Sequence, residues 1–120
     1  MKDLLESGRL YDFYGALLTE DQQQILQMYY FEDLSLAEIA ASRGTSRAAV
    51  HDLIRRSENK LRGYEERLHL VERFLHQEER FGRVGSLLER ICRMEDQLPD
   101  GVKEILAEIE QETRSLRADV

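Results

Sequence analysis

Five basic side chains fall within one short stretch of the chain, at Arg47, Arg55, Arg56, Lys60 and Arg62. Guanidinium and ammonium groups can bind the phosphates of nucleic acid, and an arginine can also bond both acceptors on the edge of a guanine. Two acids, Asp52 and Glu58, lie among them, so residues 46–62 carry a net charge of +3. The stretch predicts a modest basic patch.

The rest of the chain is acidic. Its 120 residues include 17 basic and 24 acidic side chains, for a formal charge of −7. The charge is −5 over residues 1–45, +2 over 46–76 and −4 over 77–120. Because a net negative charge repels nucleic acid, we expect any such contact to be confined to the region that begins at residue 46.

The composition predicts one helix-rich, all-α protein. Hydrophobic residues make up 42% and charged residues 34%, and there is a single proline. No apolar run is long enough to cross a membrane, and segment 1–10, which is amphipathic and carries acids, does not resemble a secretory signal. The one cysteine, Cys92, excludes an internal disulfide. We therefore expect a cytoplasmic protein with no membrane insertion.

The segment "LSLAEIAASRGTS" at 34–46 has the pattern of a helix-turn-helix. Ser35 and Glu38 are spaced as a capping box for a helix over 36–43, and Gly44 suits the left-handed residue that ends it. Ser46 can cap the next helix. The predicted scaffold comprises Ser35, Glu38, Ile39, Ala40, Gly44, Ser46, Val50, Leu53 and Ile54. A generic helical hairpin is the alternative.

The second helix of such a motif presents its N-terminal residues to base edges in the major groove. Arg47 is then the best candidate for a base contact, whereas the later basic residues would meet phosphates. Asp52 would repel phosphate and suits only a cytosine amine. For each arginine the alternative is a solvated face paired with an acid. The predicted nucleic-acid-binding residues are Arg47, Ala48, His51, Arg55, Arg56, Lys60 and Arg62.

Helical periodicity continues on both sides of the motif. It predicts helices over 3–18 and 20–31, the second opened by a capping box of Thr19 and Gln22. Beyond the motif, the fourth helix could extend as far as Gly82, with a break in "RFGRVGS" at 80–86. Two further helices, over 86–97 and 102–117, are expected after it. We therefore predict a domain over 1–80 that includes the long fourth helix, and a helical extension over 81–120 that packs on it or on a partner.

One apolar row in the fourth helix has coiled-coil spacing: Leu61, Tyr64, Leu68, Val71 and Leu75. This row, or the C-terminal helices, could join two copies of the chain. A homodimer is expected because one small patch of charge +3 gives little affinity for nucleic acid.

Other chemistry is not expected. The three histidines lack metal-ligand spacing, so neither a metal nor a cofactor is predicted, and an enzyme is disfavoured. Cys92 is predicted to be buried. The aromatic residues of 11–14 and 29–31 are expected to form core rather than a stacking platform for RNA bases, with Tyr30 the most exposed of them.

The sequence also resembles known families. Residues 34–62 resemble region 4 of sigma factors, the helix-turn-helix that binds promoter elements. A longer resemblance, over about 9–75, is to the YlxM family, small bacterial proteins encoded beside components of the signal recognition particle. It is carried by "LYDFYGALLT" at 10–19, "YYFEDLSLAEIA" at 29–40, "SRAAV" at 46–50 and "YEERL" at 64–68.

The resemblance implies a sigma-region-4-like helix-turn-helix followed by a long helix and C-terminal helices. It also implies a regulatory or accessory role in the signal recognition particle pathway, an assignment that rests on gene neighbourhood. Three functions stay open: a DNA-binding regulator, an RNA- or protein-binding accessory factor of the particle, and a protein-interaction module with a helix-turn-helix scaffold. DNA is favoured over RNA as the nucleic acid, and components of the particle are candidate partners.

Overall fold

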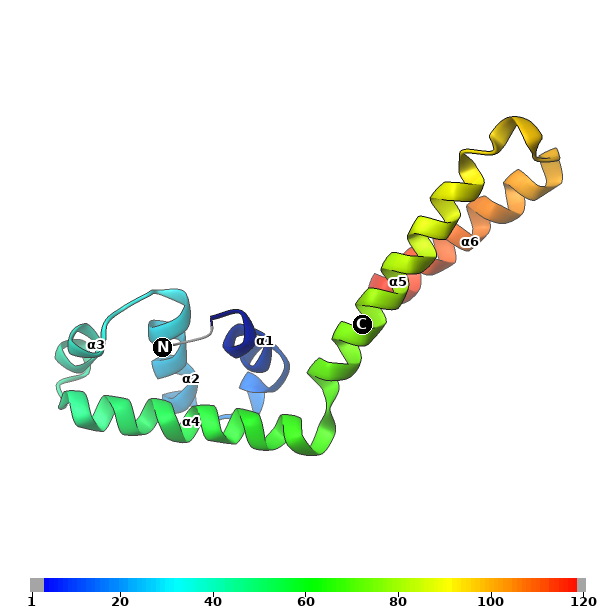
Figure 1. The fold of residues 1–120 in the computed structure, drawn as a ribbon. Coiled ribbons are helices and arrows are strands. Elements are labelled where there is room, and N and C mark those ends of the chain that lie inside the picture. The colour runs from blue at the N-terminus through cyan, green and yellow to red at the C-terminus, as the bar shows by residue number, and fades with distance from the viewer. Residues whose placement is uncertain (1–3, 119–120) are drawn as a thin grey trace. The chain divides into compact units, whose positions relative to one another are not determined.

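The computed structural model describes residues 4–118, which form six α-helices and no strand (Figure 1). The helices are α1 (Leu4–Tyr14), α2 (Glu20–Leu26), α3 (Leu36–Arg43), α4 (Arg47–Leu68), α5 (Leu70–Cys92) and α6 (Asp100–Ala118). The predicted all-α fold is confirmed. The chain divides into two compact units, Met1–Val71 and Glu72–Val120, called unit 1 and unit 2 below.

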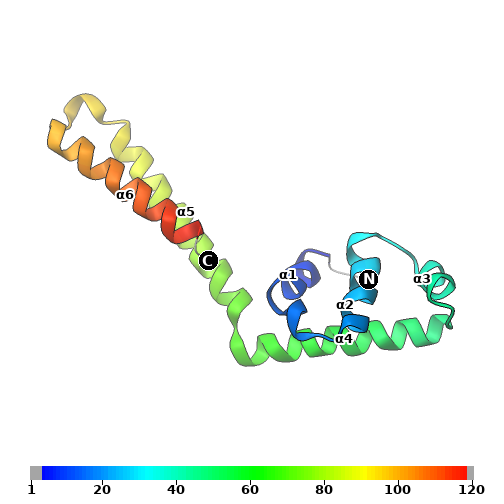
Figure 2. The ribbon, with the colours of Figure 1, turned by 180° about the vertical axis from the view of Figure 1, so that it is seen from behind.

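In unit 1 the helices α1, α2 and α3 all pack against α4, as Figure 2 shows. Their apolar side chains share one core with those of α4, because each helix places hydrophobic residues on one face at steps of three and four. The buried members are Leu10, Tyr14, Leu18, Ile25, Leu26, Tyr30, Ile39, Ala40, Val50, Ile54, Leu61 and Val71.

Both predicted capping boxes are confirmed. The Thr19 hydroxyl accepts from the Gln22 backbone N–H at 3.2 Å, while the Gln22 side chain accepts from the Thr19 N–H at 3.1 Å. Ser35 and Glu38 form the same pair of bonds at the start of α3, each at 3.1 Å. The donors that a helix N-terminus leaves unpaired are satisfied in this way, so both helices begin where the sequence predicts.

The predicted exposure of Tyr30 is wrong. The helix over 20–31 ends in a π-turn, Gln27–Phe31, in which the Glu32 N–H bonds to the Gln27 carbonyl at 3.1 Å. This wider turn changes the direction of its side chains relative to a regular α-helix. Tyr30 is buried, whereas Phe31 is 56% exposed. Burial raises the pKa of the Tyr30 hydroxyl well above its ordinary value.

The predicted break at 80–86 is also wrong, because that segment is helical within α5. The break lies at His69, whose φ of 54° is left-handed. The Tyr14 hydroxyl donates to the Glu65 carboxylate at 2.5 Å and accepts from the Leu70 N–H at 3.1 Å. Glu65 also accepts from the Val71 N–H at 3.0 Å, so side chains cap the start of α5.

This break divides the apolar row of 61–75. Leu61 and Val71 are buried in the core of unit 1, whereas Leu68 and Leu75 are 46% and 38% exposed. The row therefore changes helix at His69 and is not one continuous coiled-coil seam.

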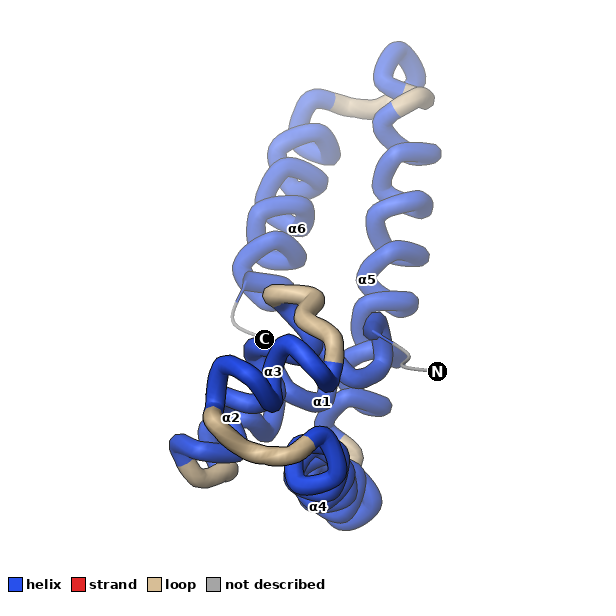
Figure 3. Tube along the Cα trace, turned by 90° about the vertical axis from the view of Figure 1, so that its left-hand side faces the viewer, coloured by secondary structure: helices blue, strands red, loops and turns tan. Residues whose placement is uncertain are grey.

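In unit 2, α5 and α6 run side by side as an antiparallel hairpin (Figure 3). Leu88 and Leu106 are its buried hydrophobic residues among those described. The predicted burial of Cys92 is wrong: the thiol is exposed and donates to Glu110 at 3.3 Å. That bond to a carboxylate raises the pKa of the thiol, which disfavours the nucleophilic thiolate.

Candidate nucleic-acid interface

The turn between α3 and α4 has the backbone geometry of a helix-turn-helix. Gly44 ends α3 with φ 66° and ψ 37°, and its N–H bonds to the Ala40 carbonyl, which also accepts from Thr45 at 3.1 Å. Ser46 then caps α4, its hydroxyl accepting from the Ala49 N–H at 3.1 Å. The positive φ is the reason for glycine here, because a Cβ at Gly44 would meet no atom within 4 Å.

The inward side of the motif joins α3 to α4. Ile39 and Ala40 on α3 are buried, as are Val50 and Ile54 on α4, while Leu53 is half-buried against the same core. These residues hold the two helices together at the turn, and the opposite side of α4 is left to solvent.

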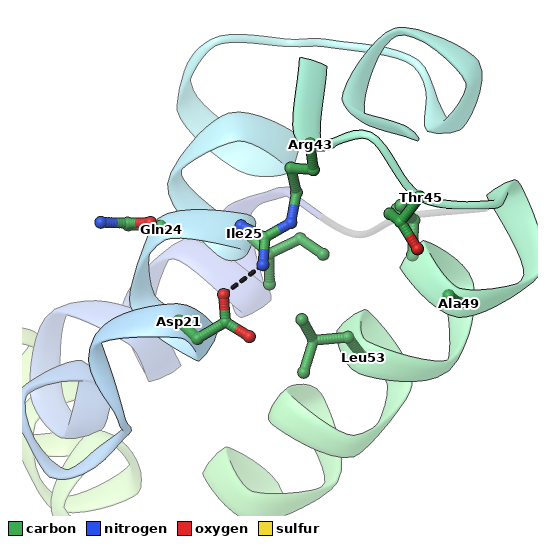
Figure 4. Close-up of a pocket in the computed structure, with 8 residues that line it drawn as sticks. Asp21, Gln24, Ile25, Arg43, Thr45, Ala49 and Leu53 are labelled. Carbon is green, nitrogen blue, oxygen red and sulfur yellow. Dashed lines mark hydrogen bonds and ion pairs between the residues drawn. The ribbon is translucent and has the colours of Figure 1, made fainter. Parts of the chain in front are cut away.

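A contact distant in sequence fixes the end of α3. Arg43, in its last turn, forms an ion pair with Asp21 in the first turn of α2. Figure 4 shows the Arg43 side chain reaching toward Asp21 beside a shallow pocket that Ala49 and Leu53 of α4 also line. The pair uses up the one positive charge that α3 carries, so α3 does not add to the basic patch.

All seven predicted nucleic-acid-binding residues lie on α4 and are exposed to solvent. Two of the basic ones share a single acid. Asp52 accepts from Arg55 at 2.9 Å with one carboxylate oxygen and pairs with Arg56 at 2.9 Å with the other. These two arginines hold the pKa of Asp52 below its ordinary value, the bond to Arg55 contributing most. Much of the charge at the middle of α4 is therefore neutralised.

The remaining cations differ in their pairing. Arg62 pairs with Glu58 at 3.2 Å, one helical turn earlier. Arg47 and Lys60 form no ion pair within residues 4–118. Arg47 also lies at the N-terminus of α4, whose first turn contains no acidic residue. The backbone N–H groups and the helix dipole there favour an anion, and Arg47 adds a free positive charge.

Comparison with known proteins agrees with this geometry. Residues 1–100 match the family described as "Putative helix-turn-helix protein, YlxM / p13 like". The chain belongs to the UPF0122 family. A UPF0122 protein of a Thermoanaerobacter strain is 41% identical over 116 residues, which cover 95% of this chain and 96% of that relative.

Other members of the family are similar over shorter stretches. One from Symbiobacterium thermophilum is 59% identical over 71 residues, which cover 59% of this chain and 66% of the relative. One from Bacillus cereus is 37% identical over 102 residues, covering 85% and 89%. The resemblance to the YlxM family is thus confirmed, and the description of that family agrees with the geometry of the turn between α3 and α4.

The described residues 4–118 contain no helix that is long and apolar enough to span a membrane. They also contain no cluster of three His, Cys, Asp or Glu side chains placed to hold a metal ion.

Two features of the interface were not predicted from the sequence. The pairing of Asp52 with both arginines follows from spacings of three and four, so helical geometry could have indicated it. The Arg43–Asp21 pair joins residues 22 positions apart, and no local pattern indicates it.

Proposed function

We propose that this chain binds nucleic acid through the exposed side of α4 and acts as a regulator of gene expression. The observation that carries the proposal is the N-terminus of α4, where Arg47 forms no ion pair with any residue of 4–118 and no acid occupies the first turn. The protein would act as a homodimer, because one small basic patch gives little affinity for nucleic acid alone. It would act in the cytoplasm and have no enzymatic activity.

DNA is favoured over RNA by the shape of the element. The major groove of B-form DNA is wide enough to admit an α-helix, whereas that of A-form RNA is deep and narrow. Arg47 and Ala48 would then contact base edges, with His51 beside them. Arg55, Arg56, Lys60 and Arg62 would contact phosphates.

One observation favours a second function. Asp52 pairs with both arginines in the middle of the exposed side of α4 and so neutralises one of their two positive charges. A helix with so little free charge is better suited to shape-based contact with RNA or protein than to sequence-specific DNA binding. The alternative is an accessory factor of the signal recognition particle, as the family's gene neighbourhood implies.

The test is a salt titration of binding to promoter DNA, unrelated duplex DNA and signal recognition particle RNA. If the protein is a DNA-binding regulator, we expect it to prefer one DNA sequence. Arg47→Ala should then reduce the difference in binding free energy between that sequence and unrelated DNA by about 1–3 kcal/mol. Arg67→Ala, a change of the same type near the far end of α4, is the matched control. Equal weak binding to every duplex, abolished at moderate salt, would contradict the regulator.

Asp52→Asn gives a second measurement on the same ligands. Releasing Arg55 and Arg56 from the carboxylate should strengthen binding. The slope of log affinity against log salt concentration should steepen by the amount expected for about one to two additional phosphate contacts. Preferential binding to the RNA, weakened by Arg55→Ala or Arg56→Ala, would support the accessory function instead. An absence of binding to all three ligands would contradict both.

A further inference from the structure

The α5–α6 hairpin leaves a large part of its hydrophobic surface uncovered. Leu88 and Leu106 are its buried apolar residues within the described chain. Several other large apolar side chains of the hairpin remain substantially exposed: Val84 at 37%, Leu87 at 51%, Ile105 at 57%, Ile109 at 42% and Leu116 at 58%. An apolar surface of this kind on one element is typical of an interaction site.

Two contacts and two buried residues identify the side on which each helix faces the other. Leu88, near the end of α5, and Leu106, near the start of α6, are both buried. Near one end the Cys92 thiol bonds to Glu110, and near the other Arg117 pairs with Glu78 at 2.8 Å. Gly85 and Glu110 line one pocket between the two helices.

The exposed apolar residues occupy a single side of the hairpin. A position whose side chain lies toward the other helix of the hairpin is called a facing position: on α5 these include 85, 88 and 92. Positions 84, 87 and 91 each precede one of them by one residue. On α6, positions 105, 109 and 116 likewise precede facing positions 106, 110 and 117. Because the two helices are antiparallel, this equal offset turns both rows to the same side. We call this side the apolar face: Val84, Leu87, Ile91, Ile105, Ile109 and Leu116.

The two outer edges of the apolar face carry opposite charges. Arg80 and Arg83 lie one turn before Val84 and Leu87, on the edge of α5 away from α6. Glu108 and Glu112 lie three residues after Ile105 and Ile109, on the opposite edge. Arg83, Glu108 and Glu112 form no ion pair within residues 4–118, so these edge charges are available to a partner.

We infer that a second copy of this chain covers the apolar face, so that the two hairpins form a four-helix bundle with α5 of each copy over α6 of the other. A two-fold axis along the hairpin places each basic edge against an acidic edge. A two-fold axis across the hairpin would instead set basic edge on basic edge and acidic on acidic, which repel. The first arrangement is therefore the one the charges select.

The register follows from the hairpin itself. The contacts Glu78–Arg117 and Cys92–Glu110 show which positions of α5 and α6 lie near the same height. Taken together, these two contacts place position 112 level with about position 86 or 87, roughly one helical turn from Arg83. An axis along the hairpin keeps these heights, so the long side chain of Arg83 would lie within reach of Glu112 of the partner subunit, twice in each dimer.

This inference names the interface of the dimer in the proposed function, and it is tested on the full chain without nucleic acid. Sedimentation equilibrium at micromolar concentrations should give the mass of a dimer. Arg83→Glu should raise the dissociation constant about tenfold or more, because both edge contacts become repulsive. Adding Glu112→Arg to the same chain should restore it. Arg93→Glu, the same charge reversal one residue after the facing position 92 and so on the opposite side of the hairpin, is the matched control and should change little.

A second variant tests the apolar face directly. Ile109→Glu should give a monomer whose circular dichroism still reports the folded helices. A monomeric wild-type chain would overturn the inference, and so would a dimer that Arg83→Glu and Ile109→Glu both leave intact. Neither result depends on nucleic-acid binding, which the salt titration tests separately, so failure of one proposal can be told from failure of the other.

Discussion

The two units of this chain use hydrophobic residues in opposite ways. Of the described residues, twelve buried apolar side chains belong to unit 1, and two belong to unit 2. Unit 1 uses its apolar residues to hold a helix-turn-helix in place, whereas unit 2 presents most of its own at the surface. Since burial of apolar area is the main stabilising contribution to folding, unit 1 gains more stability from its own core, and unit 2 would gain the more from the partner copy that we propose.

The difference between the two units is tested most directly by truncating a buried side chain in the core of unit 1. Ile39 is fully buried between α3 and α4. Ile39→Ala should lower the free energy of unfolding of unit 1 by about 2–5 kcal/mol, because it removes packed methylene groups and leaves a cavity. Urea denaturation would measure it, with Leu5→Ala, at a side chain 66% exposed, as the control. An equal loss in both variants would show that unit 1 does not depend on this core.

The junction between α4 and α5 should be the next most sensitive point. Tyr14 is buried, and its hydroxyl joins Glu65 to the Leu70 N–H. Tyr14→Phe keeps the ring but leaves both groups without this partner, so we expect a loss of about 1–3 kcal/mol in unit 1.

Hydrogen exchange gives the finer readout of that variant. The amide of Leu70 should exchange faster in Tyr14→Phe, while the amides of α6 keep their wild-type rates. Tyr11→Phe, which removes a hydroxyl that accepts from the exposed Gln27 side chain, is the matched control. Unchanged exchange at Leu70 would contradict the capping role of Tyr14.

Two glycines should respond to alanine with opposite signs. Gly44 has a left-handed backbone, which costs an alanine about 1 kcal/mol or more, so Gly44→Ala should destabilise unit 1. Gly82 lies inside α5, and a Cβ there would meet no atom within 4 Å. Gly82→Ala should therefore stabilise the hairpin by about 0.5–1 kcal/mol. Thermal unfolding of each variant checks the signs, and destabilisation by both would contradict the assignment of α5 through 80–86.

The same residues explain what the sequence could and could not predict. The capping boxes, Gly44 and Ser46 were predicted because each depends on contacts within four residues along the chain. The break at His69 was missed because a histidine is an uncommon left-handed residue, and its support comes from Tyr14, distant in sequence. For the candidate interface, the basic residues were predicted to be on one helix, but which of them are unpaired depended on the side-chain geometry.

The smallest expected effect concerns the exposed Glu78–Arg117 pair. This pair joins the two helices of unit 2 by a polar contact, as the more buried Tyr14–Glu65 hydrogen bond joins α1 to α4 in unit 1. The bond to Arg117 lowers the pKa of Glu78 from its ordinary value of 4.5. A lowered pKa in the folded state means that the pair stabilises the hairpin above that value, and that this stabilisation is lost as the pH falls through the folded pKa.

Thermal unfolding of the hairpin should therefore shift to lower temperature between about pH 5 and pH 3, and Glu78→Gln should remove part of that shift. Other carboxylates titrate in the same range, so the quantity to compare is the difference between wild type and variant. Glu79→Gln, at an adjacent exposed position, is the control. An equal response in both variants would mean that water screens the pair completely, and that the hairpin is held by its apolar contacts alone.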